Sequence, residues 1–138
     1  MPLLNRDAVT AGLVASALSG APSTLLTLAR REDVLESGRA AGSILLGDRA
    51  PGPLLLAAAL PVHVALSVGW AAVLAAVVPR GRQIEGCALG GLAIAALDLV
   101  VIGRRIPRVR ALPQGRQWAD HLAFGLTVGA VLEGRRPR

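Results

Sequence analysis

The chain alternates between long apolar runs and short polar connections. Four apolar segments are rich in Ala, Leu, Val and Gly, and they cover 8–29, 54–78, 86–103 and 117–132. A helix needs about 20 apolar residues to cross a bilayer, within a range of about 17–25. The second segment is fully long enough, the first and third are adequate, and the fourth is short. We therefore expect an all-α integral membrane protein, a four-helix bundle forming a single domain over 1–138.

The first segment also has features of a secretory signal. The stretch "MPLLNR" precedes an apolar run with small residues at a possible cleavage site. Asp7 interrupts the positively charged region that such signals carry, and the apolar run continues past that site. The pattern therefore favours a membrane span over a cleaved leader.

The connection between the first two segments carries a helix signal of its own. Asp33, followed by Glu36 three residues later, is a capping-box pattern, which predicts a helix over 34–46 ended by Gly47. This helix is partly amphipathic and too short to cross, so we expect it at the membrane interface. The later connection 104–116 is rich in Arg and interrupted by two prolines, which predicts an irregular basic arm. We call the end of the bundle that carries 30–53 and 104–116 the arm side.

Composition supports a membrane protein and argues against a nucleic-acid-binding one. Of the 138 residues, 53% are hydrophobic and 17% are charged, whereas soluble domains average about 25% charged residues. All 15 basic residues are Arg, and together with nine acidic residues they give a net charge of +6. They cluster at the ends of the apolar runs without aromatic neighbours, which fits lipid headgroups better than nucleic acid. The arm side carries nine of them, so we expect it to be cytoplasmic in a bacterial plasma membrane.

Small residues recur at the four-residue spacing that lets membrane helices approach closely. These predicted packing positions are Gly12, Ser16 and Gly20 in the first segment, Gly86 and Gly90 in the third, and Gly125 and Gly129 in the fourth. We expect the Gly86–Gly90 face to meet a second copy or another membrane protein. The single cysteine, Cys87, excludes an intrachain disulfide and paired-cysteine chemistry.

Polar residues inside the apolar segments form the candidate site. His63 lies in "LPVHVALSVGW" with only apolar neighbours, and Asp98 and His121 lie in the third and fourth segments. At about 1.5 Å rise per residue, all three fall roughly 4–6 Å from their helix centres, toward the arm side. Ser23 and Thr24 fall at a similar depth. Because ionisable groups in membranes normally point into the bundle, we expect His63, Asp98 and His121 to face one another.

Further residues extend this cluster. Asp120 is predicted to lie in the first turn of the fourth helix, where the helix N-terminus favours a carboxylate. Arg105 lies on the same helical stripe as Asp98. Pro22 and Pro61 each remove a main-chain hydrogen bond near the same level, where kinks would open a small hydrated pocket.

Three functions fit these residues. The first is a non-enzymatic accessory, assembly or self-associating subunit without a cofactor, whose polar cluster holds the helices together. The second is a protein that binds haem or a divalent metal through His63 and His121, with Asp98 and Asp120 as further metal ligands. No HExxH or Glu-x-x-His spacing supports it. The third is a small transporter in which Asp98 and His63 relay protons or cations, with Ser23, Thr24, Asp120 and Arg105 nearby.

Two comparisons bear on these functions. The four-span size is that of the small multidrug-resistance exporters, but the segment 8–29 lacks the carboxylate that those exporters carry in their first helix. The "GAPST" break, the "AALDLVVIGRR" helix end and the "DHLAFG" start resemble uncharacterised small four-span integral membrane proteins of GC-rich actinobacteria. The resemblance covers most of the chain and implies an integral membrane location. It implies no activity and transfers no catalytic residue.

Overall fold

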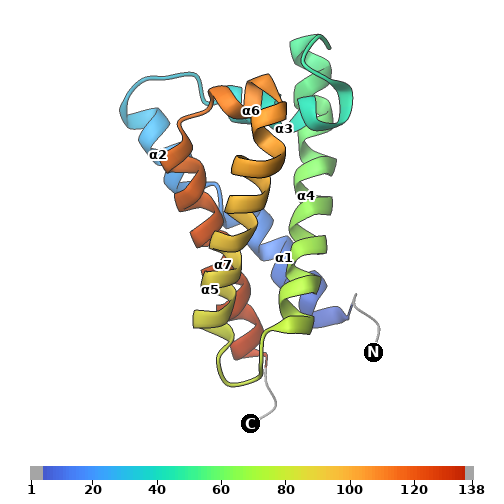
Figure 1. Ribbon diagram of the computed structural model, residues 1–138, viewed down its shortest axis with the longest axis vertical. Helices are drawn as coiled ribbons and strands as arrows, with labels where there is room; N and C mark the ends of the chain where they lie inside the picture. Colours follow the sequence, from blue (N-terminus) through green and yellow to red (C-terminus); the bar gives the residue numbers. More distant parts are fainter. Residues whose placement is uncertain (1–4, 136–138) are drawn as a thin grey trace.

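The computed structural model describes residues 5–135, and every regular element within them is helical (Figure 1). The elements, in chain order, are α1 (Arg6–Leu18), α2 (Ala21–Ala29), α3 (Glu36–Leu46), α4 (Gly52–Val77), α5 (Gln83–Ala95), the π-helix η1 (Ala96–Ile102), the 3₁₀ turn η2 (Gly103–Arg105), α6 (Pro107–Ala111) and α7 (Gln114–Gly134). Helices α3 and α6 lie together at one end of the molecule. The start of α1 and the end of α7 lie at the other end.

Three helical stretches among residues 5–135 are long and apolar enough to cross a membrane. They are 6–29, 52–77 and 83–105. The all-helical class is therefore confirmed for these residues, and the three stretches fit a membrane protein by their length and composition. The predicted fourth span, 117–132, lies within α7, which is 21 residues long but is not among these stretches. Its Gln, Arg, Asp, His and Glu side chains make it more polar than the other three.

Helices α5 and α7 pack antiparallel along a seam of glycines. A methyl group added at Gly91 would come within 2.3 Å of the His121 carbonyl oxygen, and one added at Gly125 would come within 2.1 Å of the Cys87 carbonyl oxygen. At Gly129 the corresponding distance to the Gln83 carbonyl oxygen is 2.5 Å. Only glycine fits at these points, so the two helices approach backbone to backbone.

Helix α4 is held at two other close crossings. A methyl group at Gly12 of α1 would meet the Val68 Cα at 2.6 Å, and one at Gly42 of α3 would meet the Leu55 carbonyl oxygen at 1.9 Å. The arm-side helix α3 is therefore packed tightly against the start of α4. It still exposes Ile44, Leu45 and Leu46, as an interfacial helix would.

The Gly86–Gly90 face packs against the end of α4 in this fold, and both glycines are partly buried. Methyl groups added there would meet the side chains of Val78 at 2.5 Å and Leu74 at 2.3 Å, both from the same chain. These glycines accommodate the end of α4 and the residue that follows it. Packing within the bundle is thus observed at these glycines, and association of this face with a second copy or another membrane protein stays a prediction.

Local structure differs from the predicted boundaries at three points. Helix α3 begins at Glu36 rather than 34, because the Asp33 carboxylate accepts the Leu35 N–H at 2.8 Å and forms a turn there. The basic arm is not wholly irregular, since Pro107 starts the short helix α6, where its missing N–H costs nothing. The first segment is split into α1 and α2.

Candidate functional site: a polar belt at a broken helix

The break between α1 and α2 exposes main-chain groups in the middle of an apolar stretch. Helix α1 ends at Leu18 and α2 begins at Ala21, with Gly20 between them at ψ 0°. Pro22 has no N–H to offer to the carbonyl one turn earlier, which favours a break at this point. In lipid such freed groups need partners within the protein. Side chains from two other helices supply them.

His63 of α4 supplies the partner on the α1 side. Its Nε2 lies 2.9 Å from the carbonyl oxygen of Ser16, in the last turn of α1. A carbonyl only accepts, so Nε2 carries the proton and donates it. His63 is otherwise exposed on α4, and it lies two residues after Pro61, through which α4 continues unbroken.

Asp120 of α7 supplies the partner on the α2 side. Its Oδ1 accepts the main-chain N–H of Ser23 at 2.9 Å, at the N-terminus of α2. Ser23 is only 6% exposed, and α2 has no side-chain cap from its own N-cap residue. The carboxylate thus meets the positive end of the α2 dipole and one of its free donors.

The next residue, His121, contacts Asp98 of the π-helix. Its Nε2 lies 3.5 Å from Asp98 Oδ2, and both side chains are partly buried. Its Nδ1 lies 2.8 Å from the Gln117 carbonyl oxygen one turn earlier. Because Nδ1 must donate to that carbonyl, Nε2 carries either a lone pair or the second proton of an imidazolium.

The π-helix that carries Asp98 has no signal in the sequence pattern. The main-chain N–H of Gly103 bonds to the Asp98 carbonyl, five residues earlier rather than four. A methyl group at Gly103 would lie 2.4 Å from that oxygen, so glycine is required where the wide turn closes. Such π segments are rare and are found frequently at functional sites.

The polar belt comprises His63, Asp98, Asp120, His121 and the two main-chain groups of the helix break. The structure brings Asp98 and His121 together, whereas His63 bonds to α1 instead of to either of them. Two other sequence candidates, Thr24 and Arg105, are exposed, and Asp98 pairs with His121 rather than with Arg105. A cavity lined by Asn5, Asp7, Arg80 and Gln83, among others, lies away from the polar belt, at the opposite end from the arm side.

Among residues 5–135, no group of three or more His, Cys, Asp or Glu side chains is placed to hold a metal ion. His63 and His121 each use one ring nitrogen on a different carbonyl. Binding of haem or a metal remains a prediction, which an absorption spectrum and metal analysis of the purified protein would test.

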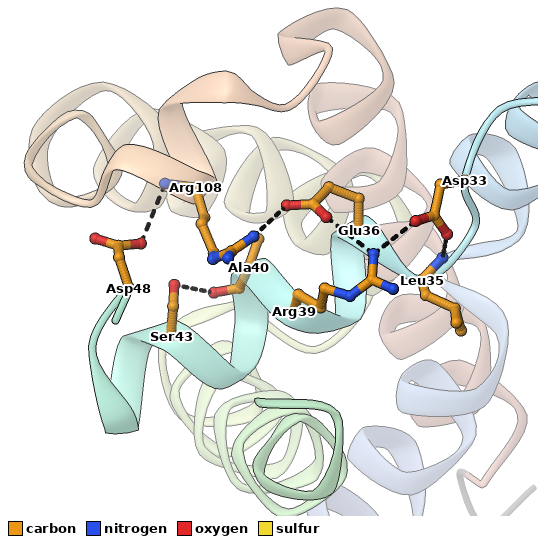
Figure 2. Close-up of polar contacts among 8 residues, drawn as sticks. All are labelled: Asp33, Leu35, Glu36, Arg39, Ala40, Ser43, Asp48 and Arg108. Carbon is orange, nitrogen blue, oxygen red and sulfur yellow. Dashed lines mark hydrogen bonds and ion pairs between the residues drawn. The ribbon is translucent and has the colours of Figure 1, made fainter. Parts of the chain in front are cut away.

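An ionic network on the arm side connects α3 to α6. Figure 2 shows Glu36 between two guanidinium groups, at 3.1 Å from Arg39 and 2.8 Å from Arg108. Arg39 also lies 2.6 Å from Asp33, and this hydrogen bond holds the pKa of the Asp33 carboxyl below its usual value. Asp48 accepts the main-chain N–H of Arg108 at 3.3 Å. The network ties the loop before α4 to the basic arm.

Arg116 makes a second arm-side connection, which sequence analysis did not single out. Its guanidinium binds both carboxylate oxygens of Glu32 and the hydroxyl of Thr27. The side chain is only 10% exposed. Its hydrogen bond lowers the pKa of the Glu32 carboxyl. It therefore joins the start of α7 to the end of α2.

Comparison with known proteins adds no family to this geometry. No family model, curated protein or solved structure matches the chain.

Proposed function

We propose that the protein is a small non-enzymatic integral membrane subunit, a four-helix bundle that associates with itself or with another membrane protein. The observation that carries this proposal is that side chains of the polar belt hydrogen-bond to main-chain groups of a neighbouring helix. His63 and Asp120 each bond to a main-chain group at the helix break, from two different helices. Such bonds hold a bundle together, at about 1 kcal/mol each in a membrane. They leave the apolar outer faces to make contacts with lipid or protein.

The seam with α5 supports α7 as the fourth span. The close approaches at Gly91, Gly125 and Gly129 run along both helices. Helix α7 therefore lies beside the membrane-capable stretch 83–105 over most of the length of α5. Its polar side chains are shielded by that packing, because only Leu126, Ala130, Gly134 and Arg135 of 117–135 are exposed.

Labelling with an impermeant thiol reagent tests the fourth span. Gly115 and Gly134 are the second and the last residue of α7, and nothing lies within 4 Å of a methyl group added at either. Gly115→Cys and Gly134→Cys, each in a Cys87→Ala background, should label from opposite sides of the membrane, with Gly115→Cys protected in intact cells. Labelling of both from the same side would show that α7 does not cross.

An exposed small-residue stripe on α4 supports association. Ala57, Pro61, Ala65 and Gly69 follow one another at four-residue spacing, and all are exposed. A methyl group added at Gly69 would meet nothing within 4 Å. This spacing allows close approach of a second membrane helix.

A larger side chain placed in this stripe tests whether it is an association surface. Gly69→Leu should lower the mass of the detergent-solubilised complex and abolish crosslinking in membranes, because the larger side chain blocks close approach. Ala93→Leu, at an exposed position on α5, is the matched control and should change neither. Equal mass and crosslinking for Gly69→Leu and the parent would remove this face as an association surface.

A proton relay is the second candidate, favoured by the contact between Asp98 and His121, whose Oδ2 and Nε2 atoms lie 3.5 Å apart. Reconstitution in liposomes with an imposed pH gradient tests it. Asp98→Asn should abolish the flux, and the arm-side variant Asp33→Asn should leave it unchanged. A parent protein that moves no protons or cations under these conditions would exclude the relay.

A further inference from the structure

The basic arm is packed against the arm-side end of the bundle. Val109 and Leu112 are each 9% exposed and belong to an apolar cluster against which Trp118 of α7 packs. Arg108 turns toward α3, where its guanidinium lies 2.8 Å from Glu36 (Figure 2). Helix α6 therefore has a fixed place at this end of the bundle and does not extend away from it.

Three arginines of this arm have no partner. Arg104, Arg105 and Arg110 are exposed, and their guanidinium groups make no hydrogen bond or ion pair with any residue within 5–135. The first two lie in η2, which packs against α6, where the third lies. The arm-side carboxylates that could neutralise them are all engaged by other arginines. These carboxylates are Glu32, Asp33, Glu36 and Asp48.

An exposed apolar surface directly precedes the three arginines. Val100, Val101 and Ile102 of η1 are 48%, 47% and 46% exposed. Together with Arg104 and Arg105 they form the end of the membrane-capable stretch 83–105. In a bilayer these apolar side chains contact acyl chains, and the arginines that follow lie at the level of the headgroups. This order matches that of a phospholipid along the membrane normal.

We propose that the basic arm binds the headgroup of an anionic phospholipid. The three free arginines supply the positive charge, and the exposed surface of η1 contacts the acyl chains. Guanidinium groups bind phosphate oxygens through paired hydrogen bonds, and clustered basic residues beside a membrane span attract anionic lipids. The inference is independent of self-association and of whether α7 crosses the membrane, because the arm continues directly from the stretch 83–105.

Native mass spectrometry of the delipidated protein in detergent tests this surface, with phosphatidylglycerol and phosphatidylcholine as the two probes. Arg104→Gln, Arg105→Gln and Arg110→Gln, combined in one chain, should lower the apparent affinity for phosphatidylglycerol on the order of a hundredfold, about fivefold for each charge. The affinity for phosphatidylcholine should change little. Lys at the same three positions keeps the charges and should retain most of the binding, which separates loss of charge from loss of structure.

The matched control removes the same charge from the same end of the bundle. Arg30→Gln, Arg31→Gln and Arg49→Gln, combined in one chain, change exposed arm-side positions outside the basic arm. A preference for phosphatidylglycerol that is lost in the arm variant and kept in this control supports the proposal. Equal losses in the two variants, or a parent protein without that preference, would overturn it.

Discussion

The carboxylate of Asp120 accepts the main-chain N–H of Ser23 at 2.9 Å, across 97 residues of sequence. An N-cap is normally supplied by the residue that precedes the helix. Here α2 is capped by a side chain from another helix, so the start of α2 forms its cap only when α7 is packed against it. Local structure and tertiary packing are coupled at this point.

Asp120→Leu should therefore destabilise the protein by about 1–3 kcal/mol, because a buried N–H loses its acceptor. Asp120→Asn keeps an acceptor oxygen at the same position and should cost less. Thermal unfolding of the two variants in the same detergent measures the difference. Equal losses would show that the charge, and not the hydrogen bond, is what matters.

Substitutions of His63 and of His121 should differ in how their effect on the free energy of unfolding combines with a substitution at Asp98. Asp98→Leu and His121→Leu remove the two sides of one contact, so their free-energy losses should be non-additive by about 0.5–3 kcal/mol. His63→Leu and Asp98→Leu touch separate partners and should be additive within about 0.5 kcal/mol. Double-mutant cycles on the free energy of unfolding measure both. A coupling of His63 equal to that of His121 would contradict the observed pairing.

The glycine seam should be intolerant of even a methyl group. Gly125→Ala places Cβ against the Cys87 carbonyl and should destabilise the protein by about 1–3 kcal/mol, the usual range for overpacking. Gly69→Ala, where the added group is free, should be neutral or stabilising, since Ala favours helix by about 1 kcal/mol over Gly. Thermal unfolding compares the two. A neutral Gly125→Ala would mean that α5 and α7 separate easily.

The Arg116–Glu32 pair gives stability with a defined dependence on pH. The pair lowers the pKa of Glu32 below its ordinary value of 4.5. Its contribution is therefore present above that value and is lost as the pH falls below it. Arg116→Gln should lower the melting temperature at neutral pH, and the gap from the parent should narrow in acid. Arg110→Gln, an exposed neighbour, should show no such gap.

The helical segments could be predicted because apolar length and Pro or Gly boundaries are properties of the local sequence. The break near Pro22 followed from the missing N–H of proline. The partner of His63 did not follow, because depth in the membrane gives no information on which neighbouring helix a side chain meets. Shared depth alone suggested Asp98, whereas the crossing at Gly12 brings α1 against α4 instead.

Other features depend on geometry that forms only in the folded chain. The π-helix around Asp98 lies in a run of Leu, Val and Ile whose periodicity cannot distinguish a wide turn from an α-helix. The long-range pair of Arg116 and Glu32 joins the first turn of α7 to the turn that follows α2, 84 residues apart in the sequence. The polarity of α7, in contrast, was visible in its sequence, and it is why the fourth span was expected to be short.

The wide turn closed by Gly103 has a consequence for sequence alignment. A π turn accommodates one more residue than an α turn, so the backbone after Ile102 is displaced by one position relative to a regular helix. A related chain with a plain α-helix here should be one residue shorter between 96 and 102. Because that stretch is a near-uniform apolar run, an alignment would easily misplace the gap. The residue equivalent to Asp98 should then be sought four positions before the equivalent of Gly103, whereas the spacing in this chain is five.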